Sequence, residues 1–452
     1  MLVVRGALAV VVGDGTEPPG DVVCDGGVVV GTPAGAPAAA APPTGAELLD
    51  ATGCVVTPGL VNAHHHLLQT AFRTLPGTRG VPMARWLRVM AAAYAATGVD
   101  AELVHACALA GLTESLLSGV TTVADHHLTW PAGNDDGVGL ARAAAAAAQE
   151  VGARLVVVRG SAGDDPGQAA ASADAVAAAL VGEAPGGVAP GGMLQVALGP
   201  AGVHSDPHET FVLLGEVAER RGLRRRTQAN EQVDVTAAAE RYGHRPLDLL
   251  AEWGWLAPDV TLAHLCGITA GEVARLAVAG VSATHAPGCD LPMGWGVAPV
   301  AALLDAGVPV GLGTSGGGSN DAGHLLADAR LAMQVAPLAP VGARPVAARE
   351  VLAAATAGSA AGLGRAELGH LRPGAAADLC VWDVSTVLDA GVADPVAGLL
   401  WAAPGRRPRH VVVAGRVVVR DGELPAAAAA GDGLRRVLAR RPRPAHPVDP
   451  PP

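Results

Sequence analysis

The chain has 452 residues, of which 50% are hydrophobic and 16% charged, and its formal net charge is -11 at pH 7. This length fits a barrel of about 250 residues joined to a smaller domain, and the acidic balance argues against nucleic acid or an anionic membrane as a partner. All 31 basic residues are arginine, which excludes a lysine Schiff base and a carbamylated lysine between two metals.

The six cysteines are scattered along the chain without CxxC spacing. They are typical of buried thiols in a reducing compartment and not of a disulfide framework. The N-terminal run MLVVRGALAVVVGDG lacks the basic start and cleavage site of a signal peptide, and no apolar stretch has the character of a spanning helix. We therefore expect a cytoplasmic protein.

Both ends of the chain carry short strand patterns. Residues 1–57 contain Val-rich runs separated by Gly, Asp and Pro, and strand-turn-strand patterns return within residues 365–424. We predict that these two segments pair into one small β-sandwich. Residues 425–452 are rich in Ala, Arg and Pro, and we expect them to form a disordered tail.

Residues 58–364 alternate between apolar strands and Ala- and Leu-rich helical stretches. The candidate strands span 60–66, 120–125, 154–159, 194–199, 224–230, 260–265, 281–286 and 309–314. Eight strand-helix repeats predict an α/β fold of the (β/α)8 barrel type. Several of these strands end in a polar residue, at the edge where such a barrel places its active site.

Three consecutive histidines end the first barrel strand, in the stretch VVTPGLVNAHHHLLQ. Side chains alternate along a strand, so His64 and His66 project to one side and His65 to the other. Two imidazoles two residues apart at the end of a buried strand form half of a metal site. A chance histidine run at a strand end is the alternative.

Motifs along nearly the whole chain resemble the amidohydrolase superfamily, and most closely its branch of purine and triazine deaminases and aminohydrolases, including the 8-oxoguanine deaminase-like group. They read PGLVNAHHHLLQT, LLSGVTTVADHH, YGHRPLDLLAEWGWL, LAH, GVSATHAP, GSND and PGAAADLCVWD. The resemblance implies a barrel with a composite β-sandwich, one zinc or iron ion, and hydrolysis of C–N bonds in a small nitrogen heterocycle. It also implies a homo-oligomer.

The resemblance assigns roles to individual residues. His64 and His66 match the metal-binding pair. Glu231 matches a proton-shuttling glutamate, and His264 matches a histidine that polarises the tetrahedral intermediate. Gln69 and His285 match positions that contact substrate. Asn320 and Asp321 belong to the same substrate-binding set, although Asp321 can instead anchor its loop.

Two positions depart from the family pattern. The motif H-x-H-x-x-E reads Arg226-Thr227-Gln228-Ala229-Asn230-Glu231, so the third metal ligand is Gln228. The catalytic, metal-binding aspartate of the eighth strand is Ser315. An amide oxygen and a hydroxyl are poorer zinc donors than imidazole and carboxylate, and the site loses the base opposite Glu231. Arg226 places a positive charge near the metal position, where it partly replaces a cation.

Other histidines leave alternatives open. His126 and His127 follow the second strand and either line the pocket or lie on a surface loop. His204 and His208, after the fourth strand, are either substitute metal ligands or loop residues.

Three functions follow from this pattern. The first is an amidohydrolase-type enzyme with a rebuilt site that acts on a small nitrogen heterocycle. The second is a metal-free relative that binds a heterocyclic ligand or supports an active partner subunit. The third is an ordinary metal-dependent deaminase in which Gln228 and another residue complete the coordination. We favour the first.

Overall fold

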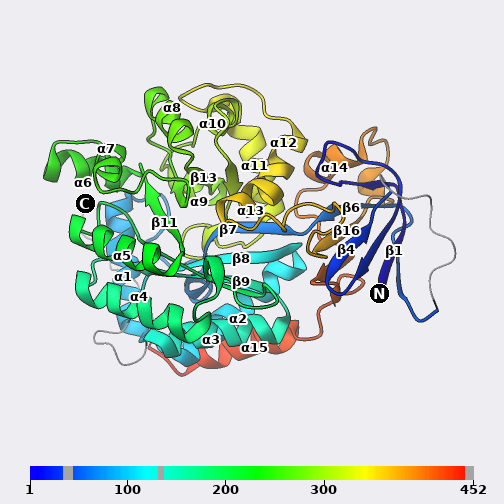
Figure 1. The fold of residues 1–452 in the computed structure, drawn as a ribbon, viewed down its shortest axis with the longest axis horizontal. Coiled ribbons are helices and arrows are strands. Elements are labelled where there is room, and N and C mark those ends of the chain that lie inside the picture. The colour runs from blue at the N-terminus through cyan, green and yellow to red at the C-terminus, as the bar shows by residue number, and fades with distance from the viewer. Residues whose placement is uncertain (34–43, 131–136, 443–452) are drawn as a thin grey trace.

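The computed structural model describes residues 1–33, 44–130 and 137–442. It contains a barrel and a smaller β-rich part that lies beside it (Figure 1). The barrel strands follow one another around a parallel sheet in the order of the chain. They are β7 (Leu60–His66), β8 (Val120–His127), β9 (Arg154–Ser161), β10 (Leu194–Pro200), β11 (Arg224–Ala229), β12 (Val260–His264), β13 (Ser282–His285), β14 (Val310–Leu312) and β15 (Ser315–Gly316).

The eighth barrel strand is split into β14 and β15, and this split strand closes the barrel. β14 pairs with β13, whereas β15 pairs with β7, with Ser315 opposite His65. At Gly313, between the two pieces, a Cβ atom would lie 2.6 Å from the His64 carbonyl oxygen, so the close approach requires glycine. The closed parallel sheet confirms the predicted (β/α)8 fold.

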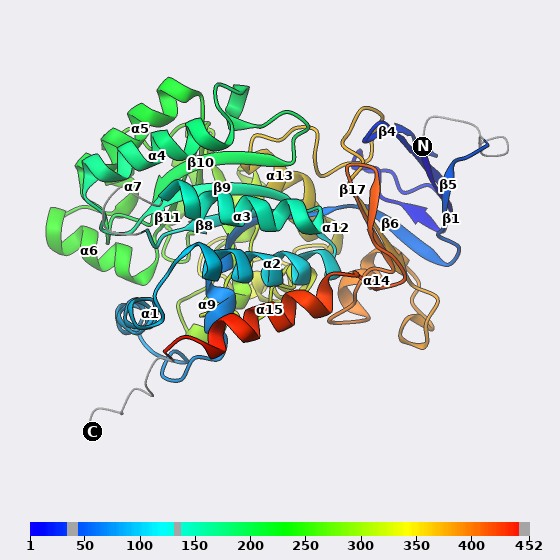
Figure 2. The same ribbon diagram turned by 90° about the horizontal axis from the view of Figure 1, so that it is seen from below.

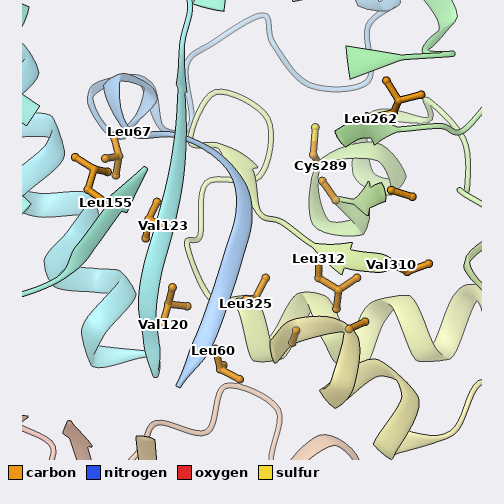
Figure 3. Packing of buried hydrophobic residues seen from close by; sticks show 14 of the residues in the cluster. Leu60, Leu67, Val120, Val123, Leu155, Leu262, Cys289, Val310, Leu312 and Leu325 are labelled. Atoms are coloured by element: carbon orange, nitrogen blue, oxygen red, sulfur yellow. The ribbon is translucent and has the colours of Figure 1, made fainter. Parts of the chain in front are cut away.

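Helices cover the outer face of the barrel. They are α2 (Ala101–Leu117), α3 (Gly137–Val151), α4 (Pro166–Leu180), α5 (His208–Arg221), α6 (Gln232–Tyr242), α7 (Pro246–Glu252), α8 (Ala270–Ala279), α10 (Val300–Asp305), α11 (Leu325–Val335), α12 (Ala348–Ala353) and α13 (Ser359–Gly362). Local sequence sets their ends: Asp100 caps α2 by accepting from Leu103 N, and Gly222 ends α5 in the left-handed conformation. Apolar side chains from strands and helices pack between the layers, including Leu60, Val120, Leu312 and Leu325 (Figure 3).

Several shorter helices and turns complete the structure. The helices α1 (Met83–Thr97) and α9 (Pro287–Met293) and the turn η1 (Leu67–Phe72) follow barrel strands at the carboxyl end. The remaining short elements are η2 (Pro185–Gly187), η3 (Ala336–Leu338), η4 (Ala354–Gly358), η5 (Val387–Asp389) and α14 (Pro395–Trp401).

The β-rich part contains two sheets that share a core. One has the order β4 (Val28–Gly31), β3 (Gly20–Asp25), β1 (Leu2–Ala7), β5 (Glu47–Asp50). The other joins both ends of the chain in the order β18 (Arg416–Val419), β17 (His410–Val413), β16 (Leu379–Asp383), β6 (Cys54–Pro58), β2 (Ala9–Val10). Val4, Leu49 and Val381 are fully buried in the core between them.

A buried ion pair ties the barrel to the β-rich part. Arg154 begins β9, and its guanidinium donates to both carboxylate oxygens of Asp378 at 2.7 and 2.9 Å. Asp378 also accepts from the backbone N–H of Ala414, before β18. Both side chains are almost fully buried.

The prediction of a disordered tail from residue 425 was wrong for its first part. Helix α15 (Ala427–Ala439) lies along α2 (Figure 2). Ala430, Leu434 and Val437 recur at helical spacing on its buried face, a pattern that the Ala- and Arg-rich composition obscured. Residues 443–452 of the predicted tail lie outside the described residues. Within the described ranges, no helix has the length and apolar character that crossing a bilayer requires.

Candidate active site

A cavity of about 670 Å³ opens at the carboxyl ends of the barrel strands. Helix α1 and Trp295 supply an apolar wall that includes Met83, Trp86, Met90 and Tyr94. The polar residues that line it are His66, Gln69, Asp125, His126, His127, His204, Gln228, Glu231, His264 and Ser315. An apolar wall with convergent polar groups at one end is typical of a small-molecule site.

His64 and His66 come from the end of β7, with ring centroids 4.8 Å apart. His66 Nδ1 donates to the His126 carbonyl at 2.7 Å, which leaves its Nε2 for the cavity. His64 Nε2 is buried and has no partner among the described residues. Burial lowers the pKa of both rings well below the ordinary value, so both imidazoles are neutral near pH 7.

Gln228 and Ser315 also face this end of the cavity, from β11 and β15. Ser315 has a φ of 53°, and its carbonyl accepts from His65 Nδ1. His65 thus points away from the cavity and joins β7 to the split eighth strand. The sequence-predicted residues His64, His66, Gln228 and Ser315 are therefore brought to one end of the barrel.

His264 stands between two carboxylates. Its Nδ1 donates to Asp290 Oδ1 at 2.9 Å, and its Nε2 lies 3.8 Å from Glu231 Oε1. Burial alone would lower the pKa of His264, but Asp290 and Glu231 raise it to about 9. Burial raises the pKa of Glu231 to about 7. The site therefore pairs a protonated imidazole with a carboxyl group that titrates near neutrality.

Backbone strain concentrates at the same residues. His264 has a φ of 72° and Leu265 a φ of 59°, and Asn230, beside Glu231, has a φ of 55°. Residues other than glycine pay of order 1–3 kcal/mol for this conformation. The strain turns the ends of β11 and β12 so that Glu231 and His264 both face the cavity.

Arg226 crosses the inside of the barrel from β11 to β7. Its Nη2 donates to the Ala63 carbonyl, next to His64, and its side chain is fully buried. Burial lowers the pKa of Arg226 to about 9, so it remains charged at neutral pH. Burial is the main cause of the low pKa of His64 and of His126, and the Arg226 charge lowers the pKa of both rings further.

The four residues predicted to contact substrate lie in different places. Gln69 lines the cavity, and its Oε1 accepts from Gly318 N at 3.0 Å. His285 is buried beside Asp290, with 3.8 Å between Nδ1 and Oδ2. Asn320 donates to the Thr314 carbonyl at 2.8 Å, and Asp321 binds Thr74 N and Arg79. The last two residues hold the loop after β15 in place.

Sequence reasoning missed several groups at the cavity. Asp290 lies in α9, after His285, and only its position in space links it to His264. His204 was expected on a loop or as a substitute ligand; it lines the cavity, and its Nδ1 is 2.7 Å from Asp234 Oδ1. His126 and His127, left between pocket and surface, both line the cavity. His208 lies in α5 and stacks on Trp253.

A match to the amidohydrolase family covers residues 55–418 of the chain. The chain belongs to the amidohydrolase family. The match spans the barrel and reaches into the strands that complete the β-rich part, which confirms the resemblance seen in the sequence.

Relatives with known activities match almost the whole chain. The 8-oxoguanine deaminase of Pseudomonas aeruginosa is 33% identical over 435 residues, which are 93% of this chain and 94% of the relative. The 5-methylthioadenosine/S-adenosylhomocysteine deaminase of Halobacterium salinarum is 34% identical over 408 residues, or 90% and 91% of the two chains. The atrazine chlorohydrolase of Arthrobacter aurescens, solved with zinc, superposes with a TM-score of 0.87 at 32% identity over 97% and 100% of the two chains.

The donors at the family's metal position, His64, His66, Gln228 and Ser315, do not fit a tightly held zinc ion. His64 and His66 are suitable ligands, but the third position is an amide and the fourth a hydroxyl. Arg226 adds a fixed positive charge beside His64, which repels a divalent cation. Tetrahedral zinc sites rely on anionic or imidazole donors, and His64 and His66 supply only two of them at this position.

Proposed function

We propose that this protein hydrolyses a C–N bond of a small, planar nitrogen heterocycle, with Glu231 and His264 as its catalytic residues. The observation that carries the proposal is the chain of contacts from Asp290 through His264 to Glu231 at the polar end of the cavity. The named activities of the relatives, which include deaminases and a triazine hydrolase, support the reaction class.

Glu231 serves as the base in this proposal. Its ionised carboxylate takes a proton from a water molecule as the water oxygen attacks the ring carbon that bears the amino group. The same carboxyl group then returns the proton to the leaving nitrogen, so that the amine departs as ammonia. A carboxyl group with a pKa of about 7 suits both transfers, because it is part ionised at neutral pH.

His264 serves as the electrophile. A protonated imidazole next to the ring nitrogen stabilises the negative charge that develops there during attack. Asp290 keeps the ring protonated and fixes its orientation through Nδ1, so Asp290 is a positioning residue.

The apolar wall binds the ring. Trp86 and Trp295 meet edge to face at 5.3 Å, and Trp86 Nε1 donates to the Gly318 carbonyl at 3.1 Å. A planar heterocycle packs against such faces, while Gln69 and Gln228 offer amide groups to its polar edge.

Ammonia release from a panel of aminopurines, aminopyrimidines and aminotriazines tests the proposal. We expect at least one substrate, and a loss of about 10²- to 10⁴-fold in kcat for Glu231→Gln with binding retained. Glu240→Gln, on the exposed face of the helix that follows Glu231, is the matched control. Equal turnover by Glu231→Gln and the natural protein would contradict the assignment.

A ligand-binding protein without turnover is the second candidate function. The positive charge of Arg226 beside His64, which has no carboxylate partner among the described residues, favours it together with Gln228 and Ser315. If heterocycles of the same panel bind tightly but release no ammonia, this second candidate replaces the first.

A further inference from the structure

Arg226 differs from the other buried arginines of the structure. Arg154, Arg159, Arg365 and Arg406 are also buried, and each pairs with a carboxylate: Asp378, Asp164, Glu367 and Asp389 respectively. Within the described ranges, Arg226 has no carboxylate partner and donates only to the Ala63 carbonyl. Burying a charge without a counter-ion is energetically costly. A buried arginine that has no carboxylate partner therefore indicates that a partner is missing.

Two donors of Arg226 and several buried imidazole nitrogens have no hydrogen-bond partner among the described residues. The Nε and Nη1 atoms of Arg226 are buried and have no acceptor among the described residues. His64 Nε2 and both ring nitrogens of His285 are likewise buried without a partner there. Arginine carries only donors, so the two Arg226 atoms require an acceptor, whereas each neutral imidazole has one N–H and one lone pair and can take either kind of partner.

The polar end of the cavity lies beside His64, the residue that follows Ala63, whose carbonyl accepts from Arg226. His66, Gln228, His264 and Ser315 line its polar end. His64 packs against His66 and His264, with ring centroids 4.8 and 5.1 Å away, and Arg226 donates to the Ala63 carbonyl, next to His64. A ligand group at this end of the cavity therefore lies within the field of the Arg226 charge.

We propose that this end of the cavity is an anion site, which receives a planar, delocalised monoanion carried by a nitrogen heterocycle. The negative group is a carboxylate or an ionised ring amide, and Arg226 supplies the counter-charge that the family's metal would otherwise provide. The anion site depends on the proposed function in one respect only, because the proposed function supplies the nitrogen heterocycle that carries the negative group.

Binding calorimetry at pH 7.5 tests the anion site. Orotate carries a carboxylate on a pyrimidine ring, urate is an ionised ring system, and uracil is the neutral comparison. We expect orotate or urate to bind at least about tenfold more tightly than uracil, because the buried charge is only weakly screened. Which of the two anions binds separates the carboxylate from the ionised ring.

Two matched variants assign the effect to Arg226. Arg226→Gln should remove the preference for the anion and increase the amount of zinc that the protein retains after desalting. Arg225→Gln is the control, because Arg225 is next in the same strand but pairs with Asp259 at 2.6 Å. Arg226→Lys should keep the anion preference, and it serves if the glutamine variant does not fold.

The proposal is overturned if uracil binds as tightly as both anions, or if Arg226→Gln and Arg225→Gln behave alike. It is also overturned if the natural protein holds one zinc ion per chain that His64→Ala removes. These readouts need no turnover, so a failure to find a hydrolysed substrate would count against the proposed function and not against the anion site.

Discussion

His264 and Glu231 face each other at the end of the cavity, with 3.8 Å between imidazole Nε2 and carboxylate Oε1. His264 ends β12 and Glu231 follows β11, and these two strands pair in parallel with Ala229 opposite His264. This pairing and the left-handed backbone at Asn230 and His264 place a base and an electrophile at the same end of the cavity. The pH dependence of the reaction follows from this pair.

The first prediction concerns the pH profile of kcat/KM. Turnover requires Glu231 ionised and His264 protonated. Since burial raises the pKa of Glu231 to about 7 and the flanking carboxylates raise that of His264 to about 9, activity should rise through about pH 7 and fall above about pH 9. Steady-state kinetics between pH 5.5 and 10 measure this. A profile that stays flat across this range would refute the pairing.

The second prediction concerns Asp290. The Asp290→Asn variant loses the negative charge that keeps His264 protonated, so the alkaline limb of the profile should move down by about one pH unit or more. The acidic limb should stay near its place. Asp432→Asn, on the exposed face of α15, is the control. An unchanged alkaline limb in Asp290→Asn would show that Asp290 has only a packing role.

The third prediction concerns acid stability. Burial lowers the pKa of His65, His126, His127 and His285 to about 4, and it lowers that of His64 and His66 well below the ordinary value. These groups bind protons in the unfolded chain before they do in the folded one. Each contributes stability that is present above about pH 6.5 and is lost as the pH falls towards 4, at most about 3 kcal/mol per ring.

Buried carboxyl groups act in the opposite direction. Burial raises the pKa of Asp125, Asp328 and Glu231 to about 7, so the folded state retains their protons over the same window. The imidazoles outnumber them, and the midpoint of thermal unfolding should fall between pH 7 and pH 5. A midpoint that rises over that range would contradict the balance of charges described here.

The fourth prediction concerns the joint between the barrel and the β-rich part. Asp378→Ala leaves the buried Arg154 without its partner and should lower the free energy of unfolding by about 3 kcal/mol or more. The double variant Arg154→Met/Asp378→Leu should recover most of that loss, because both charges are gone. Urea unfolding measures all three proteins. Equal stability of Asp378→Ala and the natural chain would show that the pair is not structural.

The barrel could be predicted from sequence because its strands are short apolar runs with polar ends. Strand β7 was predicted at its observed bounds, β8 to β12 differ by one or two residues at one end, and β13 is one residue shorter at each end. The split of the eighth strand was not visible, since it depends on the approach of Gly313 to His64. Helix α15 was missed because alanine-rich composition hides a short apolar stripe.

Part of the site could also be predicted from sequence, because several of its residues lie at or just after the ends of the predicted strands. Residues at strand ends, such as His66 and Glu231, can be assigned from the strands that carry them. Asp290 and His204 lie outside the strands, so only the folded chain brings them to the cavity. The isolation of Arg226 depends on what surrounds it in space, which no local pattern reveals.

The most direct test of the account is the metal content of purified protein, measured together with ammonia release before and after treatment with a chelator. We expect well under one zinc or iron ion per chain and turnover that survives the chelator. Under the same treatment, Gln228→His/Ser315→Asp should retain more metal. One ion per natural chain, with turnover lost on its removal and restored by zinc, would contradict the account.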